Sequence, residues 1–223
     1  MQAESSALLA INGMHCAFFD GFMFMCSEKW VWLPFYASLL YVLLRNYSVR
    51  TALTVFFLIL FTVLVTDQLS AQVMRPCFVR LRPTHMDNPI APLLHIVNDY
   101  RGGTYGFPSS HAANGGGTAF FFVFLMRDRL LSWLMLFWLF LLSYSRLYLG
   151  VHYPSDVIVG IAVGCLCALL SYFCLCQLCR CERLRFDNVE ECRSRTAKHT
   201  FVPLFVLLLT LAVFIVISAS TLL

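Results

Sequence analysis

The chain alternates long apolar runs with short polar segments, and this pattern predicts a set of membrane-spanning helices. About 20 consecutive apolar residues are enough for a helix to cross the hydrocarbon core of a bilayer. Runs of this kind, the first of them short and extended by its flanks, recur along the whole sequence. We expect six spans, at about residues 30–44, 51–69, 108–126, 130–149, 156–175 and 200–219.

The segment before the first span has a different character. Residues 1–29 are apolar but interrupted by polar residues such as Asn12 and Asp20. They have neither a basic start nor a small-residue cleavage pattern, so they do not resemble a secretory signal. Their phenylalanine-rich stretch indicates an amphipathic helix on the membrane surface, with Lys29 marking the interface. We therefore divide the chain into this interfacial segment and a transmembrane domain, residues 30–223.

Composition supports an integral membrane protein. Of the 223 residues, 60% are hydrophobic and 13% are charged, whereas soluble domains carry roughly 25% charge. The mean hydropathy is +0.75. The net charge of +4 is spread along the chain, without a lysine- and arginine-rich block, and this argues against nucleic-acid binding. The expected fold is an all-α, polytopic helical bundle in the bilayer, and the sequence indicates no oligomeric state.

Glycines recur within two of the expected spans. Residues 115–117 are all glycine, and the fifth span contains Gly160 and Gly164. In a bilayer such small residues allow two helices to pack closely. We interpret them as packing positions.

Ten cysteines are present, most of them in or just beyond the fifth span. The pattern Cys-x-Cys-x2-Cys-x-Cys over residues 174–181 has a spacing that zinc sites use. No histidine accompanies it, and cysteine is also a small apolar residue that suits membrane helices. We expect neither a metal site nor a disulfide framework.

Three polar clusters interrupt the apolar pattern. They are the segment 70–107, the start of the third span at Phe107-Pro108-Ser109-Ser110-His111, and the stretch 145–156. Polar and ionisable groups at a membrane boundary are costly and usually functional, and long structured loops are often functional as well. The clusters are therefore the candidates for a site.

The distribution of basic residues predicts that the three clusters share one membrane face. If the turns at 45–50, 127–129 and 177–199 lie on one side, that side holds ten of the sixteen basic residues. These are Arg45, Arg50, Arg127, Arg129, Arg180, Arg183, Arg185, Arg193, Arg195 and Lys198. The other side holds Lys29, Arg75, Arg80, Arg82, Arg101 and Arg146. The positive-inside rule assigns the first side to the cytoplasm, so the clusters face outward together.

The residue types in these clusters favour phosphate chemistry. Arginines without an equal number of carboxylates favour an oxyanion, and the start of the third span offers unpaired N–H groups, with Ser109 and Ser110 beside them. Of His111 and His152, one could attack phosphorus while the other protonates the leaving group. Asp156 follows His152 by four residues, one helical turn, and could hold one imidazole nitrogen.

Three motifs occur in a fixed order. They read Arg75-x6-Arg82-Pro83, Pro108-Ser109-Ser110-His111 and Ser145-Arg146-x5-His152-x3-Asp156. In this the chain resembles the type 2 phosphatidic acid phosphatase family, membrane relatives of the vanadium haloperoxidases, whose motifs are Lys-x6-Arg-Pro, Pro-Ser-Gly-His and Ser-Arg-x5-His-x3-Asp. The resemblance covers about residues 51–176 and leaves the interfacial segment and the last span, 200–219, outside it.

The resemblance implies a metal-independent lipid phosphatase that needs no cofactor and forms a phosphohistidine. His152 would be the nucleophile, and Asp156 would orient it. His111 would donate a proton to the leaving oxygen and later activate water. The phosphate would be held by Arg75, Arg82, Ser109, Ser110 and Arg146.

Two positions depart from the family pattern. Arg75 replaces a lysine, which keeps the charge but changes the reach and the donor geometry. Ser110 replaces a glycine, so the backbone can approach a phosphate less freely. Neither change removes a catalytic group, and we expect activity to be retained.

Other polar residues of the 70–107 loop match no motif. We interpret Arg80 and Arg101 as loop charges or charges that face lipid headgroups. For His85 and Asp87, contact with a substrate headgroup and stabilisation of the loop are equally good interpretations. His95 is assigned a structural role.

The expected substrate is a membrane lipid phosphate or diphosphate in the outer leaflet. Compact members of the family resemble undecaprenyl-diphosphate phosphatases, so the main prediction is hydrolysis of undecaprenyl diphosphate to undecaprenyl phosphate and phosphate. Lipid A and phosphatidylglycerophosphate are the alternatives. The expected location is the bacterial inner membrane, with the site facing the periplasm or outside. A non-catalytic lipid-binding or transport protein is the other class considered; it would form no phosphohistidine.

Overall fold

The structure, a computed structural model, describes residues 2–180 and 198–220. Within these ranges the chain is almost entirely helical, and its β-structure is limited to an isolated bridge between Leu81 and Tyr105. The all-α prediction is confirmed. The helices are α1 (Gln2–Asn12), α2 (Ala17–Ser27), α3 (Leu33–Asn46), α4 (Val49–Gln68), α5 (Arg75–Phe78), α6 (Ser110–Met126), α7 (Arg129–Tyr148), α8 (Pro154–Arg180) and α10 (Phe201–Ser220).

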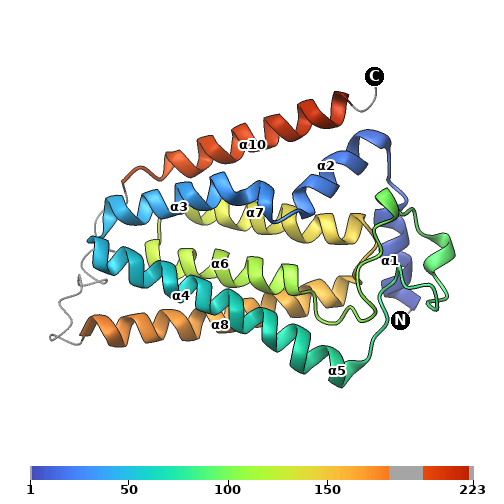
Figure 1. Cartoon of the computed structure of the whole chain (residues 1–223), viewed down its shortest axis with the longest axis horizontal. Helices are drawn as coiled ribbons and strands as arrows, with labels where there is room; N and C mark the ends of the chain where they lie inside the picture. Colours follow the sequence, from blue (N-terminus) through green and yellow to red (C-terminus); the bar gives the residue numbers. More distant parts are fainter. Residues whose placement is uncertain (1, 181–197, 221–223) are drawn as a thin grey trace.

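Helix α6 forms the centre of the bundle and packs against α4, α7 and α8. Figure 1 shows the long helices running roughly along the long axis of the molecule, with α10 against α2 and α3. Helix α1 lies across one end, beside the loop that joins α5 to α6. This arrangement places the amino end of α6 and the loop at the same end of the bundle.

The closest contact in the bundle, between α6 and α8, depends on glycine. A methyl group added at Gly160 would lie 2.6 Å from the carbonyl oxygen of Ser109, and one added at Gly116 would lie 3.1 Å from that of Ile161. Both distances are shorter than ordinary van der Waals contact, so the small residues let the two backbones approach. The predicted packing role of these glycines is confirmed, and the contact fixes the start of α8 against the start of α6.

An aromatic cluster connects α10 to the rest of the bundle. The buried Trp32 ring meets Trp138 of α7 and Phe214 of α10 edge to face, at centroid distances of 6.1 and 5.6 Å. Such contacts combine a large buried apolar area with a preferred ring geometry. The indole N–H of Trp32 donates to the carbonyl of Cys26 at 3.0 Å, which also ties the end of α2 to this cluster.

Each of the six expected spans corresponds to a helix. Among the described residues, four helices are by themselves long and apolar enough to cross a bilayer, and they are Val49–Phe78, Arg129–Tyr148, Pro154–Arg180 and Phe201–Ser220. Helices α3 and α6, with 14 and 17 residues, are shorter. The pair α1 and α2, taken together, passes the same criterion as one broken segment.

The boundary of the long polar loop differs from the prediction. Helix α4 continues through a π-helical stretch, Leu69–Met74, into α5, so the loop begins at Val79 instead of residue 70. Arg75 is therefore held on a helix. Proline is tolerated in the first turn of a helix, and Pro76 occupies this place in α5, while Val79 ends the helix in the left-handed conformation.

The amino-terminal segment also differs from the prediction of a single amphipathic helix. It forms two helices that meet at 114°. The break follows Asn12. At the next residue, Gly13, an added methyl group would lie 2.9 Å from the carbonyl oxygen of Leu9 and would clash with it. Helix α2 packs against α7 and α10, and its Met23 and Cys26 are buried.

Two cysteines of the 174–181 pattern can be placed on α8. Cys174 and Cys176 lie on α8 as free thiols. Within the described ranges no three histidine, cysteine or acidic side chains are grouped as a metal site would require. Cys181 and Cys192, together with the basic residues between 181 and 197, lie outside the described residues.

Candidate active site

The three polar clusters lie together at one end of the helix bundle. Arg75 belongs to α5, Ser110 begins α6, Arg146 is in the last turn of α7, and Asp156 is in the first turn of α8. His152 lies in the short link between α7 and α8. Segments far apart in the sequence thus meet where Figure 1 shows α1 and the α5–α6 loop.

His152 and Asp156 form a buried pair. The side chains are 1% and 0% exposed, and His152 Nδ1 lies 3.5 Å from Asp156 Oδ2. This separation is longer than a usual hydrogen bond. The same carboxylate oxygen accepts a hydrogen bond of 2.9 Å from the backbone N–H of Tyr153, which fixes its position. The carboxylate is placed to orient the imidazole from its Nδ1 side.

The other imidazole nitrogen faces an arginine. His152 Nε2 lies 3.1 Å from an Nη atom of Arg82, and because a guanidinium can only donate, Nε2 must carry the lone pair and Nδ1 the proton. Burial, reinforced by the positive charges of Arg82 and Arg146, holds the pKa of His152 well below its usual range. The imidazole is therefore neutral at neutral pH, with Nε2 in the nucleophilic form.

Three arginines lie near this histidine, and among the described residues none of them forms an ion pair with a carboxylate. The Nε atoms of Arg75, Arg82 and Arg146 are buried and have no hydrogen-bond partner among the described residues. Burial and the neighbouring guanidinium groups lower the pKa of Arg82 to about 10, so the side chain is still cationic at neutral pH. Buried cations are costly unless they are paired, and a multiply charged oxyanion would satisfy all three.

The start of α6 is held in place by its two serines. Ser109 is the N-cap; its Oγ lies 3.5 Å from the N–H of Ala112, and its own N–H donates to the backbone oxygen of Asp156 at 2.9 Å. The Oγ of Ser110 accepts a hydrogen bond of 2.7 Å from Arg75. One serine thus connects α6 to α8, and the other connects it to α5.

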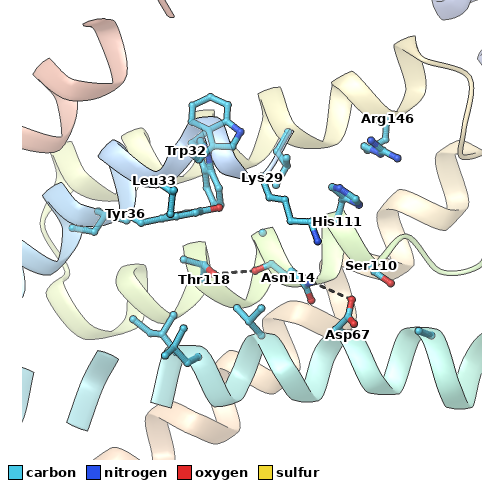
Figure 2. A pocket seen from close by; sticks show the side chains of 18 of the residues that line it. Lys29, Trp32, Leu33, Tyr36, Asp67, Ser110, His111, Asn114, Thr118 and Arg146 are labelled. Atoms are coloured by element: carbon cyan, nitrogen blue, oxygen red, sulfur yellow. Dashed lines mark hydrogen bonds between the residues drawn. The ribbon is translucent and has the colours of Figure 1, made fainter. Parts of the chain in front are cut away.

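A cavity of about 610 Å³ opens beside these residues. Figure 2 shows it between the Lys29–Tyr36 segment and α4, with α6 along its wall. One part is polar, and the wall continues over apolar side chains of α3 and α4, such as Leu33 and Ile59. The polar lining includes Lys29, Asp67, Arg75, Arg82, Ser110, His111, Asn114 and Arg146.

The structure places the eight predicted site residues in one region, but at two depths. Five of them line the cavity: Arg75, Arg82, Ser110, His111 and Arg146. The other three, Ser109, His152 and Asp156, are buried and do not line it. Arg82 both lines the cavity and contacts His152 Nε2, so its guanidinium lies between the cavity and the histidine.

Sequence reasoning missed Arg80, which was interpreted as a loop charge or one facing lipid headgroups. Arg80 does lie in the loop, but its guanidinium also donates to Asp156 Oδ1 at 2.9 Å and to Ser155 at 2.6 Å. It also pairs with Glu4 of α1 at 2.7 Å and stacks over the ring of Tyr153 at 4.1 Å. The available signal was its spacing from Arg82, since residues two apart in an extended segment face the same side.

Four other polar residues of the loop contact the loop itself or α2. Arg101 donates to the carbonyl of Thr84 at 3.2 Å, and the imidazole of His85 lies 3.6 Å from the exposed carboxylate of Asp87. None of these three side chains lines the cavity. His95 pairs with Asp20 at 2.8 Å, which joins the loop to α2.

A solved structure and curated relatives resemble this chain. The crystal structure of Aquifex aeolicus LpxE matches with a TM-score of 0.53 and 20% sequence identity, over 74% of this chain and 92% of that one. At this identity the match shows a shared fold. A Bacteroides thetaiotaomicron protein named lipid A 4'-phosphatase is 42% identical over 96% of this chain and 95% of its own length.

Two further relatives carry phosphatase names. A lipid A 4'-phosphatase of Porphyromonas gingivalis is 36% identical over 74% of this chain and 69% of its own length. An undecaprenyl-diphosphatase of Sulfolobus acidocaldarius is 32% identical over 72% of this chain and 73% of its own length. Residues 51–180 match the family model described as the PAP2 superfamily. This range of residues contains all three motifs. The chain therefore belongs to the PAP2 superfamily, as the motifs predicted.

Proposed function

We propose that this protein removes the 4'-phosphate of lipid A. Its family and relatives establish a membrane lipid phosphatase, and the proposal adds the substrate. Two relatives named lipid A 4'-phosphatase support it, one of them along nearly the whole chain. Lipid A was an alternative in the sequence-based prediction, and it now replaces undecaprenyl diphosphate as the preferred substrate.

The observation that carries the chemistry is the set of three guanidinium groups, each with a buried Nε atom, around one cavity. Arg75, Arg82 and Arg146 all line the cavity, and each has a buried Nε without a partner among the described residues. A phosphate placed between them would accept hydrogen bonds from several directions. His111 would then be on the cavity wall beside it, with His152 behind Arg82.

In the first step, the bound phosphate competes with His152 Nε2 for the Arg82 guanidinium and frees the Nε2 lone pair. Nε2 attacks phosphorus, so that an N–P bond forms while the P–O bond to the sugar breaks. His111 donates a proton to the leaving sugar oxygen. The arginines stabilise the charge that develops on the phosphate oxygens, and Asp156 stabilises the positive imidazole from its Nδ1 side.

In the second step, water enters where the sugar oxygen left. His111, now without its proton, accepts a proton from this water as it attacks phosphorus. The N–P bond breaks, inorganic phosphate leaves, and His152 is restored. Arg80 takes part indirectly, because it holds Asp156 in the orientation that the imidazole requires.

Phosphate release from purified lipid A tests the proposal. We expect the full chain in detergent to release the 4'-phosphate and to become labelled on histidine with a radioactive phosphate donor. The variant His152→Gln should lose more than about 10³-fold in rate, as nucleophile removal does elsewhere. The control is His95→Gln, since His95 lies outside the cavity and pairs with Asp20. Full activity of His152→Gln would remove the nucleophile from the mechanism.

Undecaprenyl diphosphate is the second candidate substrate. It is supported by the Sulfolobus acidocaldarius relative, which is named undecaprenyl-diphosphatase. The chemistry at phosphorus would be the same, with a phosphate instead of a sugar oxygen as the leaving group. Assaying both lipids with one preparation decides between them: a higher kcat/KM for undecaprenyl diphosphate would reverse the preference.

The proposed orientation follows from the basic residues. In the sequence, the turns at 45–50, 127–129 and 177–199 hold ten basic residues and the segments that carry the site hold six, so we propose that the site faces the periplasm. Accessibility of the free thiol of Cys77, which is exposed beside Arg75, to a membrane-impermeant reagent would test this. Labelling only after the inner membrane is opened would contradict it.

A further inference from the structure

A polar pair lies in the cavity next to the phosphate-binding residues. Asp67 of α4 and Asn114 of α6 both line the cavity, and the Asn114 amide donates to the Asp67 carboxylate at 3.4 Å. Asn114 is one helical turn along α6 from His111. Figure 2 shows the pair below His111, with the side chain of Lys29 reaching toward it from the opposite wall.

Along α4 and α6 the residues that line the cavity change from polar to apolar. With distance from Arg75 and His111, the lining passes Asp67 and Asn114 and then reaches apolar side chains such as Phe56. A substrate with its phosphate against the arginines would place the atoms attached to that phosphate beside the polar pair. Its hydrocarbon would follow along the apolar wall.

The position of Asp67 within an apolar helix calls for a physical explanation. Asp67 is an acidic residue in a segment that is otherwise apolar enough to span a bilayer, and such residues are costly there. Among the described residues, the Asp67 carboxylate accepts the 3.4 Å hydrogen bond from Asn114 and has no ion pair within 4 Å. It can therefore accept further hydrogen bonds from a ligand. Lys29, which also lines the cavity, has neither a hydrogen bond nor an ion pair to another described side chain.

The chemistry of the pair discriminates between the two candidate lipids. A polyprenyl chain begins directly after its phosphates and has no hydrogen-bonding groups, so it would leave the carboxylate and the amide desolvated and without partners. A phosphorylated amino sugar has hydroxyl and amide groups beside its phosphate. A carboxylate accepts from hydroxyl and amide N–H groups, and a carboxamide both donates and accepts.

We infer that Asp67 and Asn114 form a subsite for the sugar that carries the phosphate, and that they select sugar phosphates over polyprenyl phosphates. This inference rests on the proposed function and specifies how the cavity recognises that substrate class. A site built to hydrogen-bond a substrate group discriminates strongly against an analogue without it, because its own polar groups then lack partners.

A structural role makes a different prediction. The Asp67 carboxylate is close enough to Arg75 to interact with its charge, and Asn114 accepts a hydrogen bond of 2.6 Å from Thr66 of α4. If the pair only supported Arg75 or joined α4 to α6, its removal would slow the hydrolysis of every phosphorylated lipid to the same extent. The ratio between two substrates separates the roles, and it is insensitive to the fraction of folded protein.

The experiment compares kcat/KM on lipid A and on undecaprenyl diphosphate for Asp67→Ala and Asn114→Leu in the full chain. We expect each variant to lose about 10- to 100-fold on lipid A, the range for a hydrogen bond that involves a charged group. The loss on undecaprenyl diphosphate should be less than about 3-fold. The matched control is Asp99→Ala, which removes an exposed carboxylate from the α5–α6 loop and should change neither rate.

The contrary outcomes are distinct. If the wild-type protein prefers undecaprenyl diphosphate to lipid A, the proposed function is wrong, and the proposed sugar subsite is wrong with it. If it prefers lipid A but both variants lose activity equally on the two lipids, only the subsite is wrong. Unchanged rates on both lipids would overturn the subsite as well.

Discussion

At the scale of single residues, the two positions that depart from the family motifs contact each other. Arg75, where the family has lysine, donates to the Oγ of Ser110, where the family has glycine. The sequence presents them as two separate changes. The structure shows one interaction, in which an Nη atom of Arg75 donates to the serine hydroxyl. The Nε atom of Arg75 stays buried and has no hydrogen-bond partner among the described residues.

We therefore predict that the two positions are energetically coupled. Ser110→Gly should lower kcat/KM by about 10-fold, because one hydrogen bond of a charged group is lost. In a protein that already carries Arg75→Lys, the same change should have little effect. A double-mutant cycle of the four proteins measures the coupling. Effects that simply add would show that the contact does not matter for catalysis.

Arg80 is the residue-scale feature that the motifs did not reveal. It contacts Asp156 but does not line the cavity, so we treat it as a positioning residue. Arg80→Ala should lower kcat by about 10- to 100-fold, since a buried carboxylate loses its charged partner. KM should stay nearly constant. Steady-state kinetics, with the rate of phosphohistidine formation, checks this.

Two further variants define this role. Arg80→Lys should recover part of the rate, because the charge returns without the fork of donors. Arg101→Ala is the matched control, since it removes a cation from the same loop that contacts the backbone at Thr84. A rise in KM with unchanged kcat would instead place Arg80 in substrate binding.

Motif spacing singled out eight residues that the structure places in one region, and their catalytic roles stay predictions. It could not find Arg80, whose partners lie at positions 4 and 156, far apart in the sequence. Nor could it show that His152 is buried behind Arg82 and away from the cavity. Such relations depend on how helices pack, and residue types alone do not determine that.

At the scale of elements, the α6–α8 contact aligns the two halves of the site. Gly160→Ala would place a methyl group 2.6 Å from Ser109 O, so the helices would have to separate. We expect a loss of about 1–3 kcal/mol in the free energy of unfolding, seen as a lower midpoint in thermal unfolding in detergent. Gly103→Ala is the control, because nothing lies within 4 Å of a methyl group there. Equal midpoints would contradict the packing role.

The apolar pattern predicted where the helices lie, but it could not predict how they end. The boundary at residue 70 was wrong because the polar residues Ser70, Gln72 and Arg75 were taken for loop, whereas they continue a helix beyond its apolar part. In the amino-terminal segment the pattern did not reveal the break between α1 and α2. Helix boundaries depend on local backbone interactions that hydropathy does not describe.

At the scale of the whole molecule, the buried neutral His152 should make stability depend on pH. The unfolded chain has the ordinary histidine pKa of about 6.5, whereas the pKa of His152 in the folded protein is well below this. Below about pH 6.5 the unfolded state therefore binds a proton that the folded state does not, and the free energy of unfolding decreases. Above that pH the effect disappears.

Thermal unfolding of the protein and of His152→Gln at pH 7.5 and pH 5 measures this effect. The unchanged protein should lose more of its midpoint temperature on acidification than the variant, which lacks the group. The other histidines are present in both proteins, so their contributions to the pH dependence cancel in the comparison. A parallel decrease would mean that His152 is protonated in the folded state or that its burial does not persist in detergent.

The contacts of the amino-terminal helices determine when the site can be completed during synthesis. Glu4 of α1 binds Arg80, and Ser27 of α2 binds Arg146. Both partners leave the ribosome long after the helices that contact them. Asp156, which Arg80 also binds, comes later still. Glu4 and Ser27 can therefore meet their partners before α8 is made, whereas the contact of Arg80 with Asp156 requires the start of α8. Contacts between residues so far apart in sequence form slowly, so the site is completed only after α8 has been made.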